Sequence, residues 1–245
     1  MDQITIIIPT RNRLQKLVRC LQSIPDHPGL KVIVGCDGDF TTAQALETGL
    51  APFQKVDLVL WTRENIGSLA ICNMMAPMIP DGLLPLCDDM ELKPGAIEAA
   101  LEVFNRLYSD DDGVVGFAQE GIPSFGPTAV SLIGRRFLDR YPGRRLFYPG
   151  YRHYGDQEIF LLADSLGKFH HEPAAVVYHY HPGIHKIESD QTHQETQMCK
   201  EKDQELAKKR REAGLIWGKP ENEETKGLTR PPRDRAIKQE EVTTK

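Results

Sequence analysis

The chain has 245 residues, 40% of them hydrophobic, which allows one sizeable core with short appendages. Its formal net charge of −5 argues against a broad nucleic-acid-binding surface. No run approaches the roughly 20 apolar residues that a membrane-spanning helix needs, and no cationic leader precedes Ile4–Ile8, so we expect a cytoplasmic protein.

The first half of the chain alternates short β-branched runs with helical patterns, which is typical of βαβ units and a parallel sheet. Strands are predicted over Ile4–Ile8, Lys31–Gly35, Val56–Trp61 and Leu83–Cys87, and helices over Leu14–Leu21, from Thr41 onward and over Gly67–Met78. The last of these strands runs directly into Asp88 and Asp89. Open α/β sheets bind ligands at the carboxyl ends of their strands, so this position favours a functional role for the two carboxylates.

The second half looks mixed and more irregular. We predict a helix over Ala96–Tyr108, strands over Val114–Gln119, Ala129–Ile133 and Ala174–His181, a helix within Gly155–Gly167 and a charged helix over Met198–Ala213. The stretch after Gly218 has too few apolar residues to offset its ordering entropy, so we expect a disordered tail.

Several polar residues follow the predicted strands. Asp37, within residues 35–39, is placed to accept a hydrogen bond from the base or ribose of a nucleotide, although a loop aspartate that closes a turn explains it equally well. Asp88 and Asp89 offer hard oxygen ligands for Mg²⁺ or Mn²⁺. An unpaired carboxylate beside a buried strand would be costly without a cation, which favours the metal interpretation.

Two histidines and a further aspartate complete the candidate set. His179 and His181 are two residues apart on a predicted strand and therefore point to one face. One of them can ligate a metal through a neutral imidazole; we favour His181, because Pro182-Gly183 ends the strand there. Asp156 precedes the helical stretch from Ile159, where it is either the N-cap or, if it lies in a cleft, a general base.

Four blocks, in this order, resemble the family 2 glycosyltransferases with the GT-A fold. They are Ile8-Pro9-Thr10-Arg11-Asn12-Arg13, residues 34–39, Leu86-Cys87-Asp88-Asp89 with Pro94-Gly95, and residues 155–158 with Gly167, and the resemblance covers about residues 3 to 183. A softer block, Asn65-Ile66-Gly67 with Asn73, is similar to the family's Asn-x-Gly and a downstream Asn.

The resemblance implies a single α/β domain of GT-A type, Rossmann-like, with a mainly parallel central sheet. Residues 1–95 would form its nucleotide-sugar-binding half, 96–188 its acceptor and catalytic half, and 189–245 a helical and flexible extension. It implies an inverting, metal-dependent transfer from a nucleotide diphosphate sugar, with a UDP-sugar as the favoured donor and Mn²⁺ or Mg²⁺ as the metal. The residues implied are Asp156 as catalytic base, Asp89 at the metal, and Pro9, Thr10, Arg11 and Asp37 at the nucleotide. The full candidate set adds Asn65, Asn73 and Asp88 on the donor side and His179 or His181 at the metal.

The chain departs from the family pattern at three positions. Arg11 stands where the family often has an aromatic residue, Cys87 where the first acid of Asp-x-Asp aligns, and Gly155 where an acid usually precedes the catalytic Asp. Cys87 and Gly155 leave open a degenerate protein that binds a nucleotide sugar or glycan without turnover. A nucleotidylyltransferase is the other alternative, but it needs a glycine-rich phosphate loop near the amino terminus, and residues 9–13 contain no glycine.

The acceptor is open at this point. Small stand-alone enzymes of this type occur in bacterial surface-glycan loci and in phages, so a glycan, a small molecule or a hydroxymethylated pyrimidine in phage DNA are the alternatives. A phosphate-binding stripe for DNA could come from a set of basic residues, namely Arg135, Arg136, Arg140, Arg144, Arg145, Arg152 and Lys208–Arg211. A charge run is usually a solvated face, so DNA is the minority interpretation.

Overall fold

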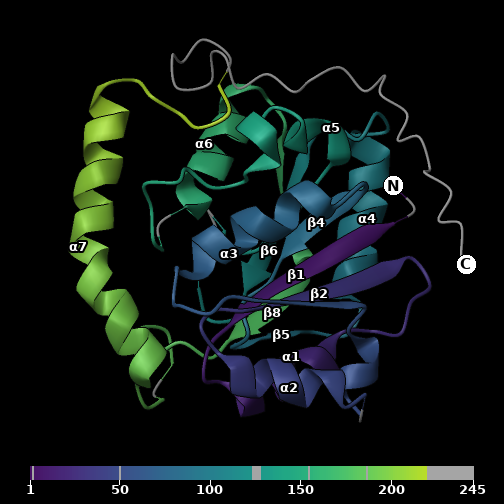
Figure 1. Ribbon diagram of the computed structural model, residues 1–245. Helices are drawn as coiled ribbons and strands as arrows, with labels where there is room; N and C mark the ends of the chain where they lie inside the picture. Colours follow the sequence, from purple (N-terminus) through teal and green to yellow (C-terminus); the bar gives the residue numbers. More distant parts are fainter. Residues whose placement is uncertain (2, 50, 123–127, 154, 186, 220–245) are drawn as a thin grey trace, which may run out of the picture.

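One eight-stranded sheet runs through the protein in this computed structural model, which describes residues 1, 3–49, 51–122, 128–153, 155–185 and 187–219 (Figure 1). The strand order is β3-β2-β1-β4-β7-β6-β8-β5. The strands are β1 Ile4–Thr10, β2 Leu30–Cys36, β3 Leu58–Trp61, β4 Gly82–Pro85, β5 Met90–Leu92, β6 Val114–Gln119, β7 Ser131–Ile133 and β8 Phe169–His179.

The amino-terminal strands form the parallel part of the sheet. β1 pairs in parallel with both β2 and β4, and β2 pairs in parallel with β3. The β-branched run of β1 suits this central place, because Ile4, Ile6 and Ile8 enter one hydrophobic cluster while Ile7 enters the other. The carboxyl ends of these strands meet at one edge, and Asp37 follows β2 there.

The rest of the sheet is mixed, as the sequence indicated. β7 pairs antiparallel with β4 and β6, while β8 runs parallel to β6 and antiparallel to β5. Four of these seven pairings are parallel and three are antiparallel, so the predicted mainly parallel sheet is confirmed. The pairing of β8 with β5 places the segment after Asp88 and Asp89 beside the strand that carries His179.

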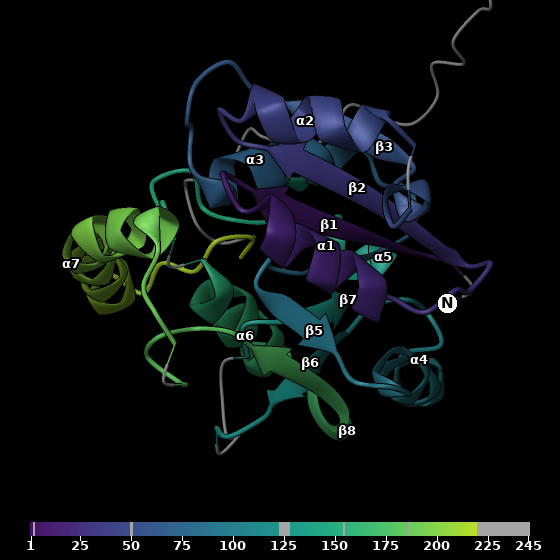
Figure 2. The same cartoon turned by 90° about the horizontal axis from the view of Figure 1, so that it is seen from below.

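Helices cover both faces of the sheet (Figure 2). One face packs against α1 Leu14–Ser23, α2 Phe40–Glu47 and α4 Ala96–Leu107, the other against α3 Ser68–Met75, α5 Arg135–Leu138 and α6 Asp156–Ser165. Short 3-10 helices lie at Phe53–Lys55, Ala76–Met78 and Pro142–Arg144. Phe104 of α4 and Phe137 of α5 are fully buried on opposite faces, and burying each such ring contributes on the order of 2 to 3 kcal/mol.

Helix α7, Gln191–Glu212, stands beside this α/β core (Figure 1). Its buried residues are polar or charged: His193, Asp203 and Arg210. The predicted start at Met198 was wrong, because the Asp190 side chain accepts a hydrogen bond from the His193 amide and begins the helix earlier. The predicted tail after Gly218 lies outside the described residues from position 220 on.

Other differences from the predictions have local causes. The strand predicted over Leu83–Cys87 ends at Pro85, and the helix predicted over Gly67–Met78 passes into a 3-10 turn at Ala76, where Pro77 lacks the amide that an α-helix needs. β5 was not predicted, since three residues are too few to show a period. None of the described helices combines the length and apolar composition that crossing a bilayer requires.

Candidate active site at the carboxyl edge of the sheet

A cavity of about 280 Å³ lies at the carboxyl ends of β1, β2 and β4 and is closed on one side by α7. It brings together ten of the predicted site residues: Pro9, Thr10, Arg11, Asp37, Asn65, Asp88, Asp89, Asp156, His179 and His181. Residues that the sequence did not single out also line it, among them Arg13, Thr192, His193 and Glu195. The separated blocks of the sequence therefore converge on one space.

Asp37 fixes the loop that follows β3. Its two carboxylate oxygens accept hydrogen bonds from the amides of Ile66 (2.7 Å) and Gly67 (2.8 Å). Gly38 allows the close approach of this loop: its φ is +65°, and a Cβ there would lie 2.8 Å from the Asn65 nitrogen. Oδ1 also accepts from the Thr62 hydroxyl (3.4 Å), whereas Oδ2 accepts only the Gly67 bond among the described contacts, so the turn-forming and nucleotide-binding interpretations of Asp37 are compatible at Oδ2.

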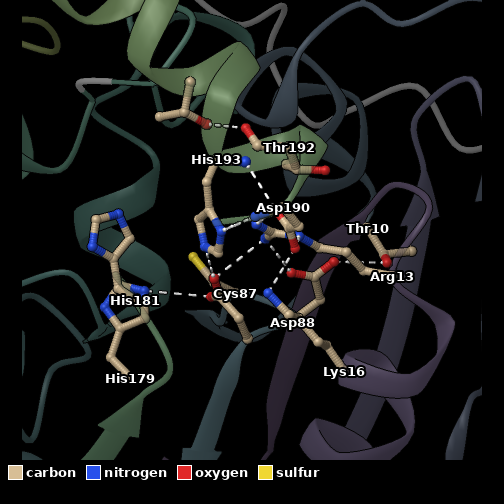
Figure 3. Close-up of polar contacts among 12 residues, drawn as sticks. Thr10, Arg13, Lys16, Cys87, Asp88, His179, His181, Asp190, Thr192 and His193 are labelled. Atoms are coloured by element: carbon tan, nitrogen blue, oxygen red, sulfur yellow. Dashed lines mark hydrogen bonds and ion pairs between the residues drawn. The ribbon is translucent and has the colours of Figure 1, made fainter. Parts of the chain in front are cut away.

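The paired acids are held by Thr10 and Arg13 (Figure 3). The Thr10 hydroxyl donates to Asp88 Oδ2 (2.8 Å), and one Arg13 nitrogen donates to Asp88 Oδ1 (3.1 Å) and to Asp89 Oδ2 (3.2 Å). The remaining Arg13 nitrogens pair with both oxygens of Asp190 (2.8 and 2.7 Å). One buried guanidinium therefore offsets three carboxylates.

The electrostatics of the two acids differ. Burial raises the pKa of Asp88 to about 6, and the charge of Asp89 adds to the rise. Burial acts on the pKa of Asp89 in the same direction, but hydrogen bonds from His179 and His193 and the charge of Arg13 together hold it well below its usual value. Asp89 is consequently the more firmly ionised member and the better cation ligand.

His179 lies against Asp89, and its tautomer follows from its other contact. Nδ1 lies 3.1 Å from Gln119 Oε1, an atom that can only accept, so Nδ1 carries the proton of the neutral ring. In that neutral tautomer the Nε2 lone pair faces Asp89 Oδ1 at 3.4 Å; when the ring is protonated, Nε2 donates to this oxygen instead, which is the hydrogen bond that lowers the pKa of Asp89. Two electron-rich atoms at this separation favour a cation between them, and a hydrogen bond from Nδ1 to a neighbouring oxygen, here that of Gln119, is typical of metal-ligating histidines.

His181 takes a different part. Its ring lies beside His179, with centroids 5.2 Å apart, so the expectation that both histidines share one side holds. Its Nδ1 accepts a hydrogen bond from the Gly183 amide (3.0 Å), which places the ring proton on Nε2 and removes the lone pair that a ligand would use there. These contacts favour His179 over His181 as the metal ligand, whereas the sequence analysis favoured His181.

Helix α7 contributes residues that sequence reasoning missed. His193 Nε2 lies 3.2 Å from Asp89 Oδ2, and Asp190 pairs with Lys16 (2.6 Å) as well as with Arg13. Asp190 and His193 form a reciprocal capping box, which the Ser/Thr-x-x-Glu/Gln signature does not cover. The cap spacing was the only signal in the sequence, and it indicated a helix start rather than a site.

Glu195, one turn further on, joins the segments that carry Arg11 and Asn65. Its carboxylate accepts from Arg11 (3.2 Å) and from the Asn65 amide (3.3 Å), and Arg152 donates to Asn65 Oδ1 (3.1 Å). The Arg11 Nε is buried and has no hydrogen-bond partner among the residues that the structure describes. Arg11 therefore retains donor capacity for a ligand.

Asp156 is the first residue of α6, not its N-cap as predicted. The N-cap is Gly155, where a Cβ would lie 2.3 Å from the Phe147 ring, so an acidic side chain does not fit at this position. Burial raises the pKa of Asp156 above its ordinary value, although hydrogen bonds from the amides of Gln157 and of Asp156 itself oppose the rise. A partly buried, cavity-lining carboxylate with a raised pKa is suited to proton transfer.

Asn73, predicted to bind the donor, does not line the cavity. Its amide nitrogen donates to the Phe147 carbonyl (2.8 Å) and its oxygen accepts from the Phe147 amide (2.9 Å), so both polar atoms are used to hold one backbone segment. Asn73 is also absent from the cavity lining. Its position on α3 explains this, since Cys72 and not Asn73 points into the cavity.

The basic residues that suggested a phosphate-binding stripe are largely paired with acids. Arg136 bonds Asp110 (2.9 Å) and Arg140 bonds Asp112. Arg144 is buried and bonds Asp139 (2.9 Å), and Lys209 bonds Glu205 (2.7 Å). These pairs neutralise the stripe and remove the main argument for DNA.

Comparison with known proteins locates the fold. No family model and no curated protein matches the sequence. Among solved structures, the chain is similar to the mannosyltransferase PcManGT from Pyrobaculum calidifontis in complex with GDP-Man and Mn²⁺ (TM-score 0.59, 16% identity). It is also similar to TarS from S. aureus in complex with UDP-GlcNAc (TM-score 0.58, 16%) and to GalNAc-T7 with UDP, GalNAc and Mn²⁺ (TM-score 0.60, 13%).

Each similarity covers 72% of this chain, but only 56%, 58% and 43% of the respective neighbour. The chain therefore spans about half the length of these structures. At such low identity the likeness shows the fold alone: a mixed α/β domain with a curled central sheet, the GT-A fold of glycosyltransferases.

Proposed function

We propose that this protein is an inverting, metal-dependent glycosyltransferase that moves a sugar from a nucleotide diphosphate sugar to an acceptor hydroxyl. One observation carries the proposal. A single cavity at the carboxyl edge of a GT-A sheet holds a nucleotide-side set around Arg11 and Asp37, the acids Asp88 and Asp89 with His179, and the partly buried Asp156. These are the groups needed to hold the donor, offset its leaving group and deprotonate an acceptor.

The side chains at the acid pair have the chemistry that a divalent cation needs from its ligands. Asp89 supplies an ionised oxygen and His179 a neutral nitrogen, a mixture suited to Mn²⁺. Among the described residues no three such side chains yet converge as a metal-binding cluster, and Arg13 supplies positive charge to both acids instead. When bound, the cation would add positive charge where the diphosphate departs.

Asp156 is the proposed base. It takes the proton of the acceptor hydroxyl as that oxygen attacks the anomeric carbon, while the bond from that carbon to the diphosphate oxygen breaks. The anomeric configuration inverts because the attack is direct, and the electron pair leaves with the nucleotide diphosphate. Thr10, Arg11, Asn65 and Asp37 hold the donor, for which a UDP-sugar is the first choice to test.

A glycan or a small hydroxylated molecule is the proposed acceptor. DNA is not proposed, because the basic residues expected to contact phosphates are paired with acids. A second candidate function is donor binding without turnover, favoured by the Arg13 guanidinium that bridges Asp88 and Asp89 where a catalytic metal would sit.

The two functions can be separated by incubating the protein with UDP- and GDP-sugars and Mn²⁺ and measuring release of the nucleotide diphosphate with and without hydroxylated acceptors. Turnover that EDTA abolishes supports the transferase. Tight binding of the nucleotide sugar, with no release of the nucleotide diphosphate whichever acceptor is present, supports binding without turnover. His179→Ala and His181→Ala, compared by Mn²⁺ titration, test the ligand assignment: the first should lose affinity and the second should stay within a few-fold of the parent.

A further inference from the structure

The imidazole of His193 reaches the acid pair from a helix that lies outside the α/β core. His193 Nε2 lies 3.2 Å from Asp89 Oδ2, although 104 positions separate the two residues. Its side chain is only 7% exposed. Figure 3 shows the ring descending from the first turn of α7 toward the group that contains Asp88 and Arg13. Burying an imidazole and a carboxylate would be costly without such a contact, so each group depends on the other for its place.

The other side of the ring is fixed by the helix cap. The Asp190 amide donates to His193 Nδ1 (3.2 Å), and the Asp190 carboxylate accepts from the His193 amide (2.9 Å). Nε2 faces Asp89 Oδ2, and an ionised carboxylate oxygen can only accept, so Nε2 is the donor in this contact, while Nδ1 also lies 2.9 Å from Asp190 Oδ1. Asp190 is itself bound to Arg13 and Lys16. The capping box therefore sets the position of this imidazole, with Nδ1 toward Asp190 and Nε2 toward Asp89.

The remainder of α7 is anchored firmly enough to make this placement precise. Both Asp203 oxygens accept from the Arg152 amide (3.2 and 3.0 Å), and one also accepts from the His153 amide (2.6 Å). Near the other end, Arg210 donates to both oxygens of the buried Glu158 (2.6 and 3.0 Å). These two attachments, at Asp203 and Arg210, fix α7 beside the α/β core and so restrict the position of its first turn.

We propose that His193 is a positioning residue for the metal site. Its Nε2 proton holds Asp89 Oδ2, which leaves Oδ1 directed at His179 Nε2 as the paired ligand set. In this arrangement α7 completes the acid site from outside the α/β core, and His193 acts through Asp89 without itself ligating the cation. The inference rests on the metal-dependent function proposed above.

Mn²⁺ titration of the full-length protein, without donor, tests the inference through affinity alone. His193→Ala should weaken Mn²⁺ binding by about 10- to 100-fold, the usual effect of removing an outer partner of a metal ligand. His193→Gln places an amide donor at nearly the reach of Nε2 and should stay within about threefold of the parent, because a positioning role needs only the donated proton. His179→Ala should lose at least as much affinity as His193→Ala.

The matched control is Glu205→Ala, which changes an exposed carboxylate on the same helix and should leave Mn²⁺ affinity and melting temperature unchanged. Equal losses in His193→Gln and His193→Ala would make His193 a ligand and overturn the positioning role. Unchanged affinity in His193→Ala, with the parent binding Mn²⁺, would overturn this inference alone. A parent protein that binds no Mn²⁺ at all would overturn the metal-dependent function and this inference with it.

Discussion

At the scale of single residues, the acid pair shows how a small difference in contacts separates two adjacent carboxylates. Asp88 and Asp89 are both almost fully buried, yet Asp89 has two imidazoles and a guanidinium around it, whereas Asp88 has Thr10 and a share of Arg13. The pKa directions of the two acids follow from these partners. Adjacent positions in a turn thus acquire different chemistry.

Asp89→Asn tests the more ionised acid while keeping its shape. We expect a loss of turnover on the order of 10² to 10³-fold, because several kcal/mol of charge stabilisation at the leaving group depend on the cation that Asp89 holds. EDTA should reduce the parent to the same level. Asp26→Ala, which removes a 90% exposed carboxylate, is the control and should keep full activity. Full activity of the parent in EDTA would refute the metal requirement.

Asp156→Asn separates a structural role from a catalytic one. The amide cannot take a proton, so turnover should fall by roughly 10² to 10⁴-fold while donor binding is retained. The melting temperature should stay the same or rise at neutral pH, because a carboxyl whose pKa is raised in the folded state destabilises that state once it is ionised. A variant that turns over within a few-fold of the parent would defeat the assignment.

The pH profile of the parent gives a second readout for Asp156. A base must be ionised, so kcat/KM should fall as the pH drops through the pKa of this carboxyl. Because burial raises that pKa, the acid limb should lie above the value of about 3.9 for an unperturbed aspartate. A profile that stays flat down to that value would contradict the proposed base.

At the scale of elements, α7 is where sequence and structure diverge most. The blocks around Pro9, Asp37 and Asp88 were predictable because each motif follows its own strand and the edge of a parallel sheet collects such positions. The parts of α7 that reach the site were not predictable. The helix has no apolar stripe from which a packed face could be predicted. Its contacts also join residues that are far apart in the chain, such as Arg11 and Glu195.

Glu195→Ala tests the contribution of α7 to the nucleotide side of the cavity. Removing this carboxylate frees Arg11 and Asn65 from their common partner, so we expect UDP to bind roughly fivefold more weakly, which corresponds to about 1 kcal/mol for a partly exposed pair. Mn²⁺ affinity should not change, in contrast to His193→Ala. Separate calorimetric titrations with UDP and with Mn²⁺ measure the two affinities. Tighter UDP binding would instead show that Glu195 competes with the nucleotide for Arg11.

Arg210→Ala tests how α7 is attached. The guanidinium is 4% exposed and binds both oxygens of Glu158, so its removal leaves a buried carboxylate with one partner fewer. Breaking such a pair typically costs about 3 to 5 kcal/mol, measurable as a lower midpoint in urea denaturation. Lys209→Ala, one position earlier and 68% exposed, is the control and should change stability by less than about 0.5 kcal/mol. A loss in Arg210→Ala as small as that of the control would show that α7 docks by other contacts.

At the scale of the whole molecule, the fold class was predictable and the order of the strands was not. The alternation of β-branched runs and helices indicated an α/β sheet, and the sheet is present. The insertion of β7 between β4 and β6 depends on pairings such as Leu83 with Ile133, which are distant in sequence. Hydrophobic period carries no information about which strand is the neighbour, so this part of the topology comes only from the three-dimensional structure.

The boundary of the folded unit is testable by two truncations a few residues apart. Trp217 is 3% exposed; its amide donates to Glu158 Oε2 (2.6 Å) and its indole nitrogen to the Arg145 carbonyl (2.7 Å). Ending the chain after Gly214 removes this ring and should cost about 3 to 5 kcal/mol, the usual effect of deleting a buried aromatic side chain. The loss should appear as a lower melting temperature.

Ending the chain after Lys219 should leave the melting temperature within about 2 °C of the parent, since the removed segment carries few apolar residues beyond Leu228, Ile237 and Val242 and cannot bury much surface. The comparison of the two truncations isolates Trp217 and its neighbours from everything that follows. A large loss of stability in the variant that ends after Lys219 would show that residues 220–245 dock on the core. Lost activity with stability retained would instead place part of that segment at the acceptor, because the donor and metal residues all precede position 219.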